Sequence, residues 1–331
     1  MDIAAIKRER AEIISRFGVW TAHNIQLGDG ISTIDGAKPS DKLRRIVQIV
    51  TDLARQPLSE LRIVDLACGE GQYAIEFARH GAHVVAIEGR EANLEKARFA
   101  KRVLGLENLE LILGDIRDLS REKYGAFDVV LCLGILYHLD APDVFKLVEN
   151  IGLACNGFAV FDTYISLVPK RRYLFHDKEY WGRDIAEHRE DQSVTERLNK
   201  LWSSLDNAKS VWLTNRTLLN LLTHCGFTSI YGCETPVELE KPLDRVTVVA
   251  IKGHKAAVLT QPSANEMLPE EIPETLVRLP SHYQTRFAGL SHLINQSFPH
   301  SWRRKVKAIL RAVGVMRSPK ERWERDDRFK W

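Results

Sequence analysis

The sequence of 331 residues contains few cysteines, little net charge and no long apolar segment. Its five cysteines are scattered, and His, Cys, Asp and Glu never recur at the spacing of metal ligands, which argues against a zinc site or a disulfide framework. A net charge of +3 is too small to indicate a nucleic-acid partner by itself. No segment has the length of a transmembrane span, and the N-terminus lacks the apolar core of a signal peptide. We therefore expect a cytoplasmic protein with no bound metal.

The hydrophobic fraction of 44% is typical of a globular protein, and from residue 61 onward short apolar runs alternate with helical patterns. The expected strands are residues 62–66, 83–87, 109–113, 127–133, 158–164, 228–233 and 245–252. The expected helices between them are residues 73–79, 92–104, 143–153 and 216–224. This alternation predicts an α/β fold with a doubly wound, seven-stranded, mostly parallel, Rossmann-like sheet that binds ligands at the carboxyl edge of its strands.

Three further regions surround this predicted core of residues 61–253. Residues 1–60 are expected to form a helical N-terminal lid, in which residues 20–30 are either a hairpin that caps the sheet or a loop that covers the substrate. Residues 166–210 are polar and lack a strand pattern, so we expect a helical insertion that covers the substrate. Residues 254–331 are expected to be a linker followed by a basic amphipathic appendage. Packing of that appendage on the protein's own surface is favoured over membrane or nucleic-acid contact.

A glycine-rich loop follows the first core strand, with the sequence Asp-Leu-Ala-Cys-Gly-Glu-Gly from Asp65 to Gly71. Gly69 and Gly71 permit positive φ and allow a ligand to approach the backbone. Asp65 can brace the loop amides or bind a cation, which suits the cationic cofactor S-adenosylmethionine better than a pyrophosphate. The looser spacing Gly69-x-Gly71-x-x-Ala74 also fits a nicotinamide dinucleotide fold, which is the alternative here.

Residues 61–253 resemble the class I S-adenosylmethionine-dependent methyltransferases. In that family the residue matching Glu88 binds both ribose hydroxyls, and those matching Asp115 and Ile116 contact the adenine. The segment that includes Leu133 matches the one that lines the methionine moiety. The resemblance implies that S-adenosyl-L-methionine is bound by Asp65, Ala67, Gly69, Gly71, Glu88, Gly89, Asp115, Ile116 and Leu133. A dinucleotide fold requires neither the acidic residue before the glycine loop nor the closing strand pair.

Residues 23–30 and 134–138 resemble the branch of that family that includes the bacterial tRNA wobble-uridine carboxymethyltransferase. In that enzyme the tyrosine matching Tyr137 helps to hold the extra carboxylate of carboxy-S-adenosylmethionine, aided by basic residues elsewhere. The lysine-containing stretch that precedes the core in that enzyme has no match in this sequence. Ordinary methyl transfer is therefore the expectation.

The sulfonium of S-adenosylmethionine is already activated, so the protein mainly aligns a nucleophile behind the methyl group. A base is needed only if the nucleophile arrives protonated. His138 is the leading candidate, because an unperturbed imidazole titrates at a pKa of about 6.5, although it could equally cap the next helix. Tyr137 is either a catalytic residue or an aromatic wall beside the methionine, and His23 could close the site from the N-terminal lid. The candidate substrate residues, each of which could equally pack in the core, are Trp20, Tyr164, Trp212 and Arg216.

These features predict a methyltransferase that moves a methyl group to a nucleophilic atom of a small molecule by in-line displacement. A tRNA wobble-uridine (carboxy)methyltransferase is one alternative, because the C-terminal region is basic. A non-catalytic cofactor-binding scaffold is another. The sequence leaves oligomer formation open.

Overall fold

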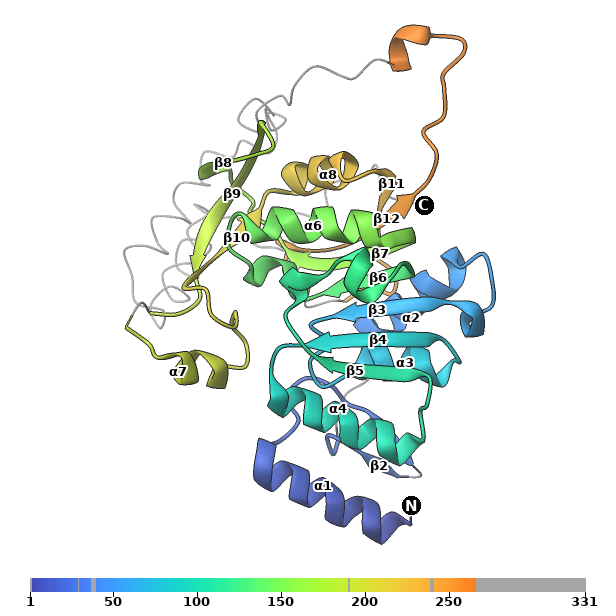
Figure 1. Ribbon diagram of the computed structural model, residues 1–331, viewed down its shortest axis with the longest axis vertical. Helices are drawn as coiled ribbons and strands as arrows, with labels where there is room; N and C mark the ends of the chain where they lie inside the picture. Colours follow the sequence, from blue (N-terminus) through green and yellow to red (C-terminus); the bar gives the residue numbers. More distant parts are fainter. Residues whose placement is uncertain (1, 29, 37–39, 190, 239–240, 266–331) are drawn as a thin grey trace, which may run out of the picture. The chain divides into compact units, whose positions relative to one another are not determined.

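The computed structural model describes residues 2–28, 30–36, 40–189, 191–238 and 241–265 (Figure 1). The amphipathic part of the predicted C-terminal appendage lies outside the described residues. Of the predicted linker, residues 254–265 are described, and they contain the 3₁₀ turn η4 (Pro262–Asn265). No helix in these described ranges has both the length and the apolarity to cross a membrane.

A seven-stranded sheet forms the centre of the described chain (Figure 1). Its strand order is β11-β12-β7-β6-β3-β4-β5, and β12 runs antiparallel to both of its neighbours while the other neighbouring pairs are parallel. The strands are β3 (Arg62–Leu66), β4 (His83–Glu88), β5 (Leu109–Leu113), β6 (Phe127–Leu133), β7 (Cys155–Tyr164), β11 (Phe227–Gly232) and β12 (Arg245–Lys252). The predicted doubly wound, mostly parallel sheet is confirmed.

Helices cover both faces of this sheet, because successive residues of its strands are apolar and point to opposite sides. Ile63 packs in one core cluster with Phe77 and Phe99, whereas its neighbour Val64 packs in the other with Phe145. Figure 1 shows α6 and α8 on one face and α2 and α3 on the other. The helices are α2 (Asp41–Leu53), α3 (Gln72–Arg79), α4 (Glu91–Leu104), α5 (Arg121–Tyr124), α6 (Asp143–Ala154) and α8 (Asn215–His224), with 3₁₀ turns η1 (Leu58–Glu60), η2 (Ile116–Asp118) and η3 (Leu136–His138).

The direction of winding reverses between β3 and β6. The chain passes from β3 to β4 and β5 on one side, and then returns to β6 and β7 on the other. Loops that leave two strands at such a reversal diverge, so a crevice forms at the carboxyl ends of those strands. The glycine-rich loop after β3 and η3 after β6 therefore face the same crevice.

The N-terminal region packs against the core. Helix α1 (Ile3–Phe17) begins after Asp2, whose carboxylate accepts a hydrogen bond from the Ala5 amide at 2.7 Å. Its Ile6 and Ile13 side chains are buried, and the helix packs against α4. The hairpin predicted as one alternative is present further along, where β1 (Gln26–Gly28) pairs antiparallel with β2 (Ile31–Ser32).

A buried ion pair fixes the segment between α1 and β1. The Glu70 carboxylate accepts hydrogen bonds from the backbone amides of Thr21 at 2.9 Å and His23 at 3.1 Å. It also pairs with Lys96 Nζ at 3.0 Å, and this ammonium donates a second hydrogen bond to the Val19 carbonyl at 2.7 Å. Because both charged side chains are almost fully buried, the pair holds the N-terminal segment against the glycine-rich loop.

The predicted helical insertion at residues 166–210 is wrong. This region forms a three-stranded antiparallel sheet of β8 (Arg171–Phe175), β9 (Lys178–Ala186) and β10 (Lys209–Leu213), and among its described residues the short α7 (Val194–Asn199) is the one helix. Tyr173 and Tyr180 are buried, while charged side chains pair across the exposed face, as Arg172 does with Glu179 at 2.7 Å. A strand with one solvated face is rich in charge, which hid its period of two from the sequence pattern.

The two ends of this insertion lie side by side. The Ser166 amide donates a hydrogen bond to the Leu213 carbonyl at 2.8 Å, and Ser166 forms a parallel bridge with Thr214. The insertion therefore leaves the core after β7 and rejoins it at the start of α8.

We predict that Lys96→Met destabilises the protein by about 3–5 kcal/mol, because it leaves the Glu70 carboxylate buried without its cation. Urea unfolding followed by circular dichroism measures the change. The matched control is Arg98→Met on the same helix, which removes a partly exposed ion pair with Glu95 and should cost less than about 1 kcal/mol. Equal losses in the two variants would contradict the assignment of a structural role to the buried pair.

Candidate active site

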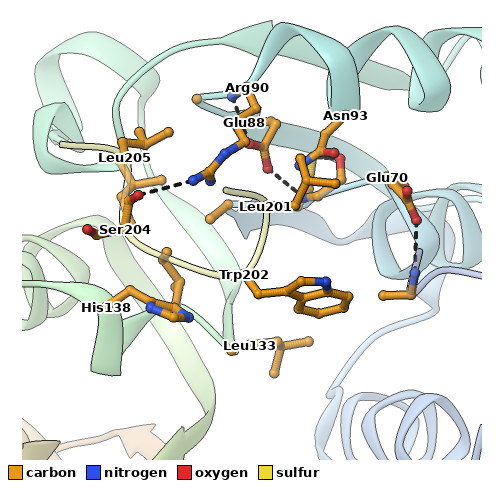
Figure 2. A pocket seen from close by; sticks show the side chains of 18 of the residues that line it. Glu70, Glu88, Arg90, Asn93, Leu133, His138, Leu201, Trp202, Ser204 and Leu205 are labelled. Atoms are coloured by element: carbon orange, nitrogen blue, oxygen red, sulfur yellow. Dashed lines mark hydrogen bonds between the residues drawn. The ribbon is translucent and has the colours of Figure 1, made fainter. Parts of the chain in front are cut away.

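A cavity of about 360 Å³ lies at the carboxyl edge of β3, β4, β5 and β6 (Figure 2). Its walls come from the glycine-rich loop, from residues 21–23 of the N-terminal segment, from η3 and from residues 201–207 of the insertion. It contains all three predicted catalytic residues, His23, Tyr137 and His138. It also contains eight predicted cofactor residues, which are Asp65, Ala67, Gly69, Glu88, Gly89, Asp115, Ile116 and Leu133.

Two glycines of the glycine-rich loop have positive φ and close neighbours, which disfavours a side chain at either position. Gly69 has a φ of +58°, and a Cβ added there would lie 3.1 Å from His23 Cε1. Gly71 has a φ of +86°, and its added Cβ would lie 2.9 Å from the Ala97 Cβ. Gly71, which does not line the cavity, therefore allows α3 to pack closely against α4. Gly69 does line the cavity, and it allows the loop backbone to lie close to the His23 side chain.

Asp65 presents an unpaired acceptor to the cavity. The side chain is 1% exposed, and within the described chain its Oδ2 atom has no hydrogen-bond partner. Burial raises the pKa of Asp65 to about 7, with a smaller contribution from the charge of Glu88. A buried acceptor of this kind is costly to leave unpaired, so it fits a cationic or hydrogen-bond-donating ligand group.

Glu88, at the end of β4, is oriented by the backbone. Its Oε2 accepts from the Gly69 amide and its Oε1 from the Arg90 amide, both at 2.8 Å. Burial raises its pKa. The Asn93 side chain also hydrogen-bonds this carboxylate, whose remaining acceptor capacity suits a hydroxyl of a vicinal diol such as a ribose.

Asp115, at the end of β5, accepts hydrogen bonds from Arg117. The Arg117 Nε atom lies 2.7 Å from Asp115 Oδ2, and the Arg117 amide lies 2.9 Å from Oδ1. Burial alone would raise the pKa of Asp115, but these hydrogen bonds and the Arg117 charge lower it overall. Asp115 is therefore an ionised acceptor, as contact with an adenine amine would require.

His138 is oriented by a carboxylate from the insertion. Its Nδ1 atom lies 2.9 Å from Glu187 Oε1. The same carboxylate accepts from the Ser210 hydroxyl at 2.7 Å and from the Ser204 amide at 3.0 Å. Burial alone would raise the pKa of Glu187, but these partners lower it, so Glu187 is ionised and His138 Nδ1 must donate. In the neutral imidazole this leaves the Nε2 lone pair free to accept a proton.

A second group of charges surrounds Tyr137 at the end of the cavity near Gly134. Asp162 accepts hydrogen bonds from Lys42 Nζ at 2.7 Å and Arg245 Nε at 2.8 Å. The Arg245 guanidinium lies 5.7 Å from the centre of the Tyr137 ring. Both Lys42 and Arg245 line the cavity, so two cations and one carboxylate converge there.

His23 lines the cavity from the N-terminal segment. Burial lowers its pKa to about 4, an effect only partly opposed by the charge of Glu70. The imidazole is therefore neutral at physiological pH. It packs edge to face on Tyr73 and accepts a long hydrogen bond of 3.4 Å from the Gln72 amide.

The four predicted substrate residues lie elsewhere. Trp20 is 4% exposed, packs on Phe99 in the core and does not line the cavity, because its neighbours are held by the buried Glu70. Tyr164 stacks on Trp212 with ring centres 4.8 Å apart, behind Tyr137. Arg216, in the first turn of α8, is also absent from the cavity wall. Tyr164 and Trp212 therefore support Tyr137 rather than face the cavity themselves.

Several cavity residues were not predicted from the sequence. They are Glu70, Arg90, Arg117, Lys42, Arg245 and Trp202. Figure 2 shows the Trp202 side chain extending across the cavity near Leu133, although no sequence pattern distinguishes it from other surface aromatics. A signal did exist for two of the others, since Arg90 and Arg117 each follow a predicted cofactor carboxylate by two residues. In the described ranges no cluster of three or more His, Cys, Asp and Glu could hold a metal ion.

Residues 57–161 match a family model described as a methyltransferase domain. The chain is 32% identical over 119 residues to a ubiquinone biosynthesis O-methyltransferase of Acinetobacter baumannii (strain AYE), covering 36% of this chain and 49% of that protein. It is also 32% identical over 120 residues to the protein of that name from Rickettsia prowazekii (strain Madrid E), covering 36% and 45%. The chain thus spans about half the length of the curated relatives it matches.

Among solved structures, the chain is similar to the N-terminal domain of EvdMO1 with S-adenosylhomocysteine bound. The TM-score is 0.59 at 22% identity, covering 76% of this chain and 98% of that one. This likeness extends the agreement in fold beyond the residues of the family model. The matched family model and the sheet order are those expected of a methyltransferase domain, and the family match is confined to residues 57–161.

Proposed function

We propose that this protein binds S-adenosyl-L-methionine and transfers its methyl group to a hydroxyl of a small molecule. The observation that carries the proposal is the His138–Glu187 pair, which places an oriented imidazole in the same cavity as the acceptors Asp65 and Glu88. The curated relatives are named O-methyltransferases, which supports a hydroxyl acceptor. Neither they nor the family model support a tRNA acceptor, and an oriented base speaks against a non-catalytic scaffold.

The residues of the cavity fit the cofactor. The unpaired Asp65 oxygen suits the methionine ammonium, and the two oriented oxygens of Glu88 suit the ribose diol. Asp115 and the Ile116 amide would hold the adenine, while Ala67, Gly69, Gly89 and Leu133 supply close backbone and apolar walls. When bound, the cofactor supplies an activated methyl group. The protein then has to exclude water, orient the acceptor and hold its proton at His138 Nε2.

The role of the base follows from the acceptor. A hydroxyl becomes a better nucleophile as its proton is removed, and a neutral imidazole can take that proton at physiological pH. Glu187 fixes the tautomer and stabilises the imidazolium that forms, because its carboxylate lies 2.9 Å from Nδ1. Tyr137, which packs against Tyr164 and Trp212, forms an aromatic wall of the cavity beside His138.

Cofactor binding should depend on pH through Asp65. The free carboxyl has a pKa of about 7, whereas a bound ammonium favours the ionised form. We therefore expect affinity for S-adenosylhomocysteine to be constant above pH 7 and to fall by up to about tenfold per pH unit below it, with proton release on binding. Isothermal titration at pH 5.5–8 in two buffers measures both effects.

The control for this titration is Asp65→Asn, which should bind more weakly and show a shallower pH dependence. Some dependence remains because burial also raises the pKa of Glu88. The absence of any binding at millimolar ligand would overturn the cofactor assignment, and a wild-type affinity independent of pH would overturn the role of Asp65.

The base assignment predicts that His138→Ala lowers kcat by about 10²- to 10⁴-fold and leaves the affinity for S-adenosylhomocysteine within a few fold. Transfer of a labelled methyl group to a panel of phenols and sugar alcohols measures the rate. Glu187→Gln should lower kcat less, since the imidazole remains. The matched control is His80→Ala, because His80 is exposed on the far end of α3. Wild-type kcat in His138→Ala would exclude a base at this position.

A second candidate is transfer of a carboxymethyl group, favoured by Lys42 and Arg245 beside Tyr137. Asp162 offsets one of these two cations, and the other could hold an extra carboxylate on the donor. If so, carboxy-S-adenosylmethionine should bind at least tenfold more tightly than S-adenosylmethionine, and Lys42→Met should abolish the difference. Equal affinities in a side-by-side titration would leave ordinary methyl transfer as the sole function proposed.

A further inference from the structure

Two arginines connect the cofactor carboxylates to one segment of the insertion, residues 198–207. Arg90 follows Glu88 by two residues at the end of β4, and Arg117 follows Asp115 by two residues at the end of β5. Because neighbouring parallel strands end at the same edge, both guanidinium groups lie beside the region assigned to the adenosine. Each reaches the 198–207 segment, so the segment contacts both cofactor loops.

Arg90 binds the backbone of the segment at several points. Its Nε donates to the Leu198 carbonyl at 3.0 Å, and one Nη donates to the carbonyls of Ser203 at 2.8 Å and Ser204 at 3.1 Å. Figure 2 shows this contact with Ser204, beside the labelled Leu205. A single guanidinium therefore holds most of the turn that covers this side of the cavity.

Two further contacts close the segment over the cavity. The Arg117 Nη that binds Asp115 also lies 2.8 Å from the Asp206 carboxylate. Leu205 packs directly over Gly89, where an added Cβ would lie 2.4 Å from Leu205 Cδ1. A glycine at this position is what permits the segment to approach the strand end so closely.

The other side of the same segment orients the base. The Ser204 amide donates to Glu187 Oε2 at 3.0 Å, and the Asn207 side chain donates to the His138 carbonyl at 3.0 Å. His188 Nε2 lies 2.8 Å from the Ser204 carbonyl. Ser210 on β10 holds Glu187 Oε1, but the amide that holds Glu187 Oε2 belongs to the segment that Arg90 binds.

We propose that the cofactor closes the 198–207 segment and thereby assembles the His138–Glu187 pair, so that the cofactor binds before the acceptor. This inference rests on the proposed function. A ligand shifts a conformational equilibrium only through contacts that differ between the two states. Leu201, Ser203 and Leu205 line the cavity, so they would cover the adenosine only when the segment is closed. Arg90 is a positioning residue in this scheme, since it acts through Ser204 and Glu187.

The segment has the properties of an element that opens on its own. Apart from the short α7, it has no regular structure, and Arg90 together with Arg117 and Leu205 supplies its contacts with the cofactor loops. Regions with few buried apolar contacts open at low free-energy cost. Closing over a bound ligand would bury the apolar side chains of Leu201 and Leu205 and favour the closed state.

Hydrogen exchange of the full-length chain, with and without S-adenosylhomocysteine, tests the proposal. In the wild type the ligand should slow exchange at residues 62–71 and 88–93, and also at residues 198–207. In Arg90→Met the protection at 62–71 should persist while that at 198–207 is lost or reduced at least tenfold. Leu205→Ala, which leaves Arg90 intact, should reduce the protection of the same segment. Arg172→Met, which removes an exposed pair on β8, should behave as the wild type.

The outcomes separate the two proposals. No protection at residues 62–71 in the wild type would mean that the cofactor assignment itself has failed. Protection at residues 62–71 without protection at 198–207, or equal protection of 198–207 in the wild type and Arg90→Met, would overturn the closure mechanism and leave the proposed function standing.

Discussion

The Glu70–Lys96 ion pair is the interaction on which the site depends. Glu70 belongs to the glycine-rich loop, Lys96 to α4, and the amides that Glu70 accepts from belong to the N-terminal segment. The buried Glu70 carboxylate thus holds His23 close to the glycine-rich loop, next to Gly69. The strand and the helix on either side of the loop set the position of Glu70, so this pair links the N-terminal wall of the cavity to the central sheet.

The fold and the cofactor side of the site were predictable from the sequence because their signals are local. Buried parallel strands are continuous apolar runs, and the residues that follow them must meet at the carboxyl edge. Asp65, Glu88 and Asp115 each lie within two residues of the carboxyl end of a strand, so their convergence on one cavity required only the strand order. Asp65 lines the cavity, as its place near the end of β3 led us to expect, whereas its raised pKa depends on burial that only the structure shows.

Tyr137 and His138 were predicted, but the part of the cavity that the insertion supplies was not, because its residues are distant in sequence and lack a period. Glu187 lies 49 positions beyond His138 in a region whose charges suggested a solvated helix. In fact the charges of β8 and β9 pair across the outer face of a small sheet, while Tyr173 and Tyr180 pack inward. For Trp20 the sequence left contact with the substrate and packing in the core open, and the structure shows packing in the core. The buried Glu70–Lys96 pair holds the neighbouring residues there.

The two ends of the insertion lie side by side, so the insertion could be replaced as a unit. Since Ser166 and Leu213 are joined by a hydrogen bond, the intervening chain could be replaced by a longer or shorter one without moving β7 or α8. The matched domain of residues 57–161 would keep the cofactor, while the wall facing the acceptor diversified. The His138–Glu187 pair spans this boundary, with His138 in the matched domain and Glu187 in the insertion. Any replacement that preserved the chemistry would have to bring its own carboxylate, which limits how freely acceptor preference can diverge.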